Sequence, residues 1–125
     1  MSARIAVIED NPDNRLLVQA LLEDLYELTE YETGTEAVDG LADDRPDLVL
    51  LDISLPEMDG TEVLAWIREQ EALEGLPVIA LTAHAMAGDR EKYLSLGFDD
   101  YLTKPIVDEA VLLETIERWL TEEGR

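Results

Sequence analysis

Short apolar runs alternate with longer amphipathic stretches along the chain, and this alternation predicts five strands, each followed by a helix. The predicted strands are Arg4–Ile8, Leu28–Glu32, Asp47–Ile53, Val78–Leu81 and Asp100–Thr103. Strands that are apolar on both faces and separated by helices are typical of a parallel sheet that is covered on both sides. Because crossovers between parallel strands are right-handed, we predict an α/β fold with a doubly wound sheet.

The predicted helices follow recognisable start and stop signals. Asn11 and Pro12 suit an N-cap and a first helical turn, and Leu17, Leu21 and Leu25 then recur at four-residue spacing, which indicates a first helix of about 14 residues. The other helices are expected from Thr33 to Leu41, around Val63–Ile67 with an end at Gly75 and Pro77, from Ala85 to Leu96, and from Asp108 to Leu120.

The second predicted helix carries two opposing signals. Thr33 and Glu36 have the spacing of a capping box, which favours a helix start. Gly40 lies in the interior of the same helix, where we expect it to cost about 1 kcal/mol relative to alanine.

Length and composition indicate one globular domain over residues 1–125, with 46% hydrophobic and 31% charged residues. The chain has 9 Lys+Arg against 30 Asp+Glu, a formal net charge of −21, and no cysteine. So acidic a chain repels phosphate backbones and anionic lipid, so we expect no direct binding of nucleic acid or membrane, and metal cations or basic partner surfaces instead. Without a signal-peptide pattern or a membrane-spanning apolar run, we expect a cytoplasmic protein.

Polar residues follow four of the five predicted strands at their carboxyl ends. They are Glu9 and Asp10 after the first strand, Asp52 near the end of the third, Thr82 directly after the fourth and Lys104 after the fifth. Because ligands of open parallel sheets bind outside the carboxyl ends of the strands, we expect these side chains to converge.

Three converging carboxylates repel one another unless a cation is bound or protons are shared, and an all-oxygen donor set suits Mg²⁺. With a lysine opposite, such a cluster favours phosphoryl transfer, in which a carboxylate can act as nucleophile. Other readings stay open at this point. Glu9 and Asp10 could be a solvated helix start, Thr82 a helix cap, and Lys104 a structural ion pair.

Four motifs in this order resemble the receiver domain of two-component response regulators, over essentially the whole chain. They are Ile8–Asn11, the segment from Leu51 to Gly60 that contains Asp52 and Met-Asp-Gly, Ala80–Ala83, and Tyr101–Pro105. The resemblance implies a flavodoxin-like receiver fold, with five helices and a five-stranded sheet of order 2-1-3-4-5.

The resemblance also implies roles for particular residues. Asp52 would be the phosphoacceptor, and the metal Mg²⁺ would be held by Glu9, Asp10, Asp52 and the backbone carbonyl of Ser54. Thr82 and Lys104 would contact the phosphoryl oxygens.

Further residues would act on the switch and on the phosphoryl lifetime. Tyr101 would be the switch aromatic, which turns inward when Thr82 moves toward the phosphoryl group. Ser54 and His84 border the site and would tune the lifetime of the phosphoryl group, with an ordinary loop histidine as the alternative for His84.

The family resemblance implies a bacterial signalling protein rather than a turnover enzyme. The expected partners are a sensor histidine kinase or a histidine phosphotransfer protein, and an output protein that binds the face of the fourth helix, fifth strand and fifth helix. A stand-alone regulator, a relay shuttle and a receiver cut from a hybrid kinase remain open.

Two alternative functions share parts of this pattern. A haloacid-dehalogenase-like phosphatase also uses an Asp nucleophile on a parallel sheet, but it needs a second acid where this chain has Ser54. A flavodoxin-like FMN-binding module needs a hydroxyl- and glycine-rich loop after the first strand, where Glu9 and Asp10 would repel the phosphate.

Overall fold

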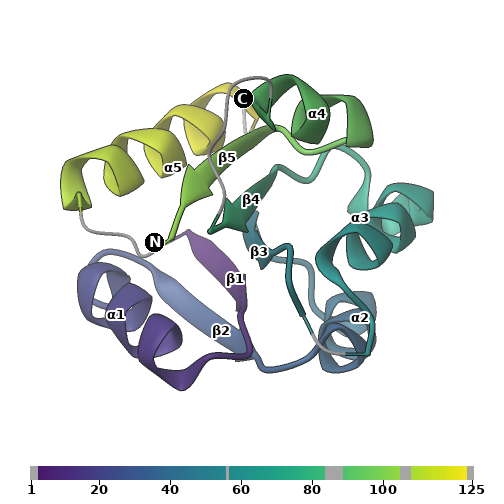
Figure 1. The fold of residues 1–125 in the computed structure, drawn as a ribbon, viewed down its shortest axis with the longest axis horizontal. Coiled ribbons are helices and arrows are strands. Elements are labelled where there is room, and N and C mark those ends of the chain that lie inside the picture. Colours follow the sequence, from purple (N-terminus) through teal and green to yellow (C-terminus); the bar gives the residue numbers. More distant parts are fainter. Residues whose placement is uncertain (1–2, 56, 84–88, 105–107, 124–125) are drawn as a thin grey trace.

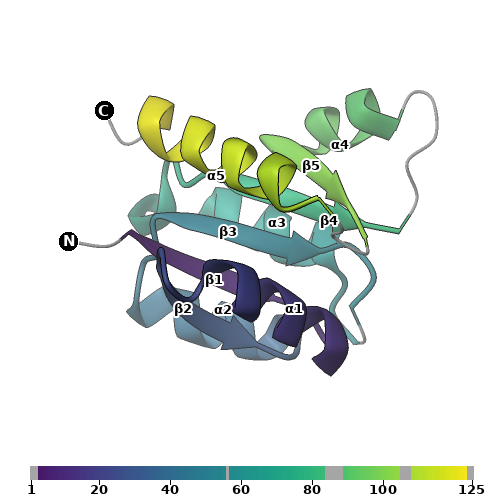
Figure 2. The same ribbon diagram turned by 90° about the vertical axis from the view of Figure 1, so that its left-hand side faces the viewer.

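The computed structural model describes residues 3–55, 57–83, 89–104 and 108–123, with side chains left out for residues 89, 90 and 121–123. The five strands found in these described segments lie in one parallel sheet of order β2-β1-β3-β4-β5, and their arrows point the same way in Figure 2. The strands are β1 (Arg4–Ile8), β2 (Glu27–Tyr31), β3 (Leu48–Asp52), β4 (Val78–Thr82) and β5 (Asp100–Thr103). The predicted doubly wound fold and strand order are therefore confirmed.

Helices cover both faces of the sheet, as Figure 1 shows. The α-helices of the described segments are α1 (Pro12–Leu22), α2 (Gly34–Asp43), α3 (Gly60–Glu69), α4 (Asp89–Leu96) and α5 (Glu109–Glu123), and a 3-10 helix, η1 (Glu71–Leu73), follows α3. One face of the sheet packs against α1 and α5, and the other against α2, α3 and α4. None of the described helices is long and apolar enough to cross a bilayer.

The sheet divides the core into two half-cores, and its central strand β3 contributes side chains to both. All five of its residues are buried, and successive side chains of a strand point to opposite faces. Val49 and Leu51 belong to the half-core under α2, α3 and α4, whereas Leu48 and Leu50 belong to the half-core under α1 and α5.

Several element ends differ from the sequence-based expectation. The helix α1 has 11 residues, fewer than the predicted 14 or so, because the amides of Leu25 and Tyr26 both donate to the carbonyl of Leu22 in a turn. Leu25 is 50% exposed, so the prediction that it belongs to the apolar stripe of the helix was wrong. The edge strand β2 lies one residue earlier than predicted, since Glu27 pairs with Arg4 of β1.

Helices α2 and α3 begin with related caps. The hydroxyl of Thr33 accepts a hydrogen bond from the amide of Glu36, as predicted, but the Glu36 carboxylate accepts from the amide of Glu32, so only half of the expected capping box forms. A complete capping box joins Asp59 and Glu62 at the start of α3.

Packing against Tyr31 explains why position 40 is a glycine, although glycine is unfavourable inside a helix. The ring of Tyr31 in β2 lies directly over Gly40, and a Cβ there would overlap the ring.

The third helix is shorter than predicted. It ends at Glu69, before the predicted stop at Gly75. The predicted start of the fourth helix at Ala85 lies outside the described residues.

Candidate functional site

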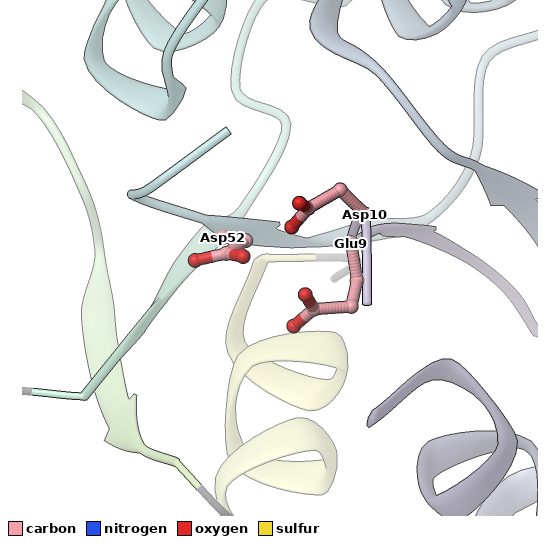
Figure 3. A group of neighbouring side chains, drawn as sticks. All are labelled: Glu9, Asp10 and Asp52. Atoms are coloured by element: carbon pink, nitrogen blue, oxygen red, sulfur yellow. The ribbon is translucent and has the colours of Figure 1, made fainter. Parts of the chain in front are cut away.

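Three carboxylates come together at the carboxyl edge of the sheet (Figure 3). Glu9 and Asp10 follow β1, and Asp52 is the last residue of β3, the neighbouring strand. Each offers a carboxylate oxygen within 4.8 Å of those of the other two. Glu9 and Asp52 are each 1% exposed, whereas Asp10 is exposed. The sequence-based expectation that these acids converge agrees with this geometry.

Lys104 joins the cluster from the end of β5. Its Nζ lies 2.9 Å from Oδ2 of Asp52 and 3.3 Å from Oε1 of Glu9, so one ammonium group pairs with both buried carboxylates. The backbone amide of Ser54 donates to Oδ1 of Asp52 at 3.0 Å, and the amide of Asn11 donates to Oε2 of Glu9 at 3.1 Å. Both buried carboxylates are therefore fixed in orientation.

Burial and the neighbouring charges shift the pKa values of two groups in this cluster. The pKa of Glu9 rises to about 7, first because the carboxyl is buried and then because Asp52 lies beside it, although the Asn11 amide and Lys104 act in the opposite direction. Burial alone would lower the pKa of Lys104, but the hydrogen bond and charge of Asp52, together with Glu9, outweigh burial and raise it. One lysine thus leaves the carboxylates partly uncompensated.

The donor set fits a divalent cation. Among the described residues, the ammonium group of Lys104 pairs with two of the three carboxylates, and the exposed Asp10 leaves the cluster open to solvent. Oxygen donors with room for water are what Mg²⁺ prefers in proteins. Glu9, Asp10 and Asp52 are the residues that would hold it.

Gly60 shapes the loop that follows Asp52. Its amide donates to the carbonyl of Ile53 at 2.9 Å, and its Cα lies so close to the backbone of Asp52 that a Cβ would overlap the Asp52 carbonyl oxygen. The first turn of α3 therefore closes back on the end of β3, and the capping box of Asp59 fixes it there.

Arg15 contacts the backbone of the site, and the sequence analysis did not predict this contact. One of its guanidinium nitrogens donates to the carbonyls of Glu9 and Asp10, at 2.9 and 3.2 Å. The same side chain pairs with Glu30 and Glu32 at the end of β2, at 3.8 and 3.7 Å. Its position one helical turn after Asn11 is the signal that could have indicated this contact.

Thr82 and Tyr101 belong to a second group of side chains beside the acidic cluster. Thr82 is 3% exposed, and its backbone carbonyl accepts from the amide of Lys104 at 2.7 Å. Its hydroxyl lies 3.1 Å from the hydroxyl of Tyr93 in α4, and the Tyr93 and Tyr101 rings lie 6.0 Å apart. Tyr93 was not singled out in the sequence, and His84 lies outside the described residues.

Comparison with known proteins identifies relatives along almost the whole chain. The sequence profile of the response regulator receiver domain matches residues 5–117. The polar-differentiation response regulator DivK of Brucella ovis is 40% identical over 121 residues, which cover 96% of this chain and 98% of DivK. The sensor protein GacS of Pseudomonas syringae pv. syringae is 45% identical over 120 residues, 93% of this chain but only 13% of GacS.

Solved structures of receiver domains superpose closely on this fold. The receiver domain of a sensor histidine kinase from Pseudomonas aeruginosa PAO1, described with a magnesium ion coordinated in its active-site cleft, has a TM-score of 0.87 at 39% identity, covering 97% of this chain and 99% of its own. The receiver domain of a histidine kinase from Syntrophus aciditrophicus has a TM-score of 0.86 at 34% identity, covering 97% and 92%.

Proposed function

The chain belongs to the response regulator receiver domain family, and from this membership we propose that it is a phosphoacceptor whose Asp52 takes a phosphoryl group. The observation that carries the proposal is the pairing of a buried Asp52 with Lys104 at 2.9 Å, inside a cluster of three carboxylates. Receiver domains act in two-component signalling, as signalling domains and not as typical turnover enzymes, and this chain is proposed to act in the same way.

In the proposed reaction a carboxylate oxygen of Asp52 attacks the phosphorus of a phosphohistidine. The new bond is an acyl phosphate P–O bond, and the P–N bond breaks with its electron pair passing to the leaving imidazole, which takes up a proton. Ser54 and Lys104 hold the Asp52 carboxylate in one orientation through its two oxygens, which reduces the entropy lost on the way to an in-line geometry.

The remaining site residues would stabilise charge. Glu9, Asp10, Asp52 and the backbone carbonyl of Ser54 are proposed to hold Mg²⁺, which supplies positive charge to the phosphoryl oxygens when it is bound. Lys104 adds a second positive charge beside Asp52, and Thr82 is proposed to donate its hydroxyl to a phosphoryl oxygen. Ser54 and His84 are proposed to tune how long the phosphoryl group lasts.

Two kinds of partner follow from the proposal. The proposed phosphoryl donor is a sensor histidine kinase or a histidine phosphotransfer protein, and the likeness to receiver domains of kinases supports such a donor. The transfer is proposed to take place in the cytoplasm. The output is a protein contact through the face of α4, β5 and α5, with Tyr101 as the switch aromatic. Leu94, Leu96 and Val111 expose apolar surface on these helices, which supports that docking face.

Acetyl phosphate provides the test, because it donates a phosphoryl group without a kinase. We expect intact-mass spectrometry to show one phosphoryl group on the wild type with Mg²⁺, and none with a chelator or on the Asp52→Asn variant. The exposed Asp39 serves as the matched control, since Asp39→Asn should be labelled like the wild type. Labelling of Asp52→Asn at another residue would refute the assignment.

A further inference from the structure

The three carboxylates of the acidic cluster differ in what holds them in place. The carboxylates of Glu9 and Asp52 are each held by Lys104 and by one backbone amide. The carboxylate of Asp10 is exposed, and within the described segments no hydrogen bond or ion pair holds it. The direction in which the Asp10 side chain points therefore depends on the backbone at this residue.

Arg15 holds that backbone on both sides of Asp10. One guanidinium nitrogen donates to the carbonyl of Glu9 at 2.9 Å and to the carbonyl of Asp10 at 3.2 Å. These two carbonyls belong to the two peptide groups that flank the Cα of Asp10. Because peptide groups are planar, their orientations set both backbone dihedrals of Asp10 and hence the direction of its side chain.

Arg15 is itself held at both ends. Its amide donates to the carbonyl of the N-cap residue Asn11 at 3.0 Å, which places it in the first turn of α1. Its side chain is 16% exposed and pairs with Glu30 and Glu32 at 3.8 and 3.7 Å. Helical side chains lean toward the N-terminus of their helix, so this position is suited to reach the loop before α1.

The charge of Arg15 and its hydrogen bonds predict opposite effects on a metal ion. A positive charge beside a cation site repels the cation, so loss of this charge alone would tighten Mg²⁺ binding. Loss of the bonds to the carbonyls of Glu9 and Asp10 would instead free the Asp10 carboxylate to point elsewhere and would weaken binding. The sign of the change therefore separates the two effects.

We propose that Arg15 is a positioning residue for the metal site and acts on Mg²⁺ through the backbone of Asp10. It adds no ligand, but it holds the Asp10 carboxylate beside those of Glu9 and Asp52, so that less conformational freedom is lost when the metal binds. This inference rests on the proposed function, because that function assigns Mg²⁺ to these three carboxylates.

Calorimetry of Mg²⁺ binding to the metal-free protein is the first test. Arg15→Met keeps an unbranched apolar side chain and removes the charge and the donors. Residues that hold metal ligands in place typically contribute about 10–100-fold to metal affinity. Because Arg15 acts on one carboxylate of three, we expect about tenfold weaker binding, at the lower end of this range. Unchanged or tighter binding would overturn the inference.

Two further variants separate hydrogen bonding from charge. Arg15→Lys keeps the charge and a donor that can reach the carbonyls, so its Mg²⁺ affinity should lie between those of the wild type and Arg15→Met. Arg45→Met removes the same charge from an exposed arginine that precedes β3, at the opposite edge of the sheet, and donates to the carbonyl of Ala72. At about 0.15 M salt this control should leave the Mg²⁺ affinity unchanged.

A double-mutant cycle with Asp10→Ala shows whether Arg15 acts through Asp10. Asp10→Ala removes one carboxylate and should weaken Mg²⁺ binding by itself. Adding Arg15→Met should then cause no further weakening, because position 10 has no carboxylate left to orient. A further loss as large as that in the wild-type background would show that Arg15 acts on the fold of the site in general, and would overturn the inference.

The same measurements distinguish failure of the inference from failure of the proposed function. If the wild type binds Mg²⁺ and Asp10→Ala weakens binding, but Arg15→Met does not, the inference is wrong and the proposed function stands. If the wild type does not bind Mg²⁺, both are wrong.

Hydrogen exchange of the Asn11 amide gives a readout that needs no metal. This amide belongs to the same peptide group as the Asp10 carbonyl and donates to Oε2 of Glu9 at 3.1 Å. In metal-free Arg15→Met we expect it to exchange faster than in the wild type, while the amides of β3 keep their rates. An unchanged rate at Asn11, or an equal increase throughout β3, would overturn the inference.

Discussion

The carboxyl group of Glu9 should make the metal-free protein less stable as the pH rises. Its pKa is about 7 in the folded protein, against an ordinary value of 4.5, chiefly because it is buried beside Asp52. The folded state therefore binds this proton more tightly than the unfolded state, and the free energy of unfolding falls between these two pH values. The difference corresponds to roughly 3 kcal/mol at full strength, and solvent at the mouth of the cluster reduces it to about 1–3 kcal/mol.

Glu9→Gln isolates this contribution, because glutamine has the same shape and does not titrate. In a chelator, we expect the variant to match the wild type near pH 5 and to exceed it by about 1–3 kcal/mol near pH 8. Urea unfolding across this range at fixed ionic strength measures the difference. Glu114→Gln, at an exposed site on α5, should show no such trend. A Glu9→Gln variant that is no more stable than the wild type near pH 8 would refute the electrostatic reasoning.

Three other predictions follow from the structure. Mg²⁺ at about 100 times its dissociation constant should raise the melting temperature by roughly 5–10 °C over the chelated protein, and an unchanged value would argue against a metal at Glu9, Asp10 and Asp52. Gly60→Ala should lower the free energy of unfolding by about 1–3 kcal/mol and weaken Mg²⁺ binding, because its Cβ meets the Asp52 backbone; chemical denaturation and calorimetry check both effects. Because the net charge is −21, raising KCl from about 0.05 M to about 1 M should raise the melting temperature, and a salt-independent value would contradict self-repulsion as a destabilising force.

The bounds of three strands could be predicted closely from the sequence. The strands β1 and β5 have the predicted bounds, and β3 lies within one residue of them at each end. In β1 and β3 a continuous apolar run ends in acidic residues, which marks the strand clearly, and the short edge strand β5 is followed by Lys104 and Pro105. The edge strand β2 has a weak alternating pattern, so its register is set by pairing with β1, which the sequence does not show.

Helix ends were harder to predict because several depend on tertiary contacts. The strongest stop signals after α3 were Gly75 and Pro77, but α3 ends at Glu69. There the guanidinium of Arg68 donates to the carbonyl of Leu76, shortly before β4, and to the carbonyl of Gly97, which lies far away in the sequence. No local pattern predicts such a contact.

The acidic cluster and Lys104 were predictable, because each follows a recognisable strand and parallel strands end at one edge. The contacts of Arg15 and Tyr93 were not, because each joins a helix side chain to a loop or strand that only the folded chain brings near. From the sequence, a tyrosine in a polar helix is expected to lie on the surface, and only the structure shows that Tyr93 is buried against Thr82 of β4.

The division of the core by the sheet has a consequence for which substitutions this protein can accept together. Lys104, Glu9, Leu17 and Val18 line a small cavity on the α1 side of the sheet, whereas the Thr82–Tyr93 pair belongs to the opposite side. Because the two half-cores lie on opposite faces of the sheet, substitutions of apolar residues in one should add to those in the other with little coupling. Homologous α1 segments could therefore be grafted onto this chain while α2, α3 and α4 keep their native packing.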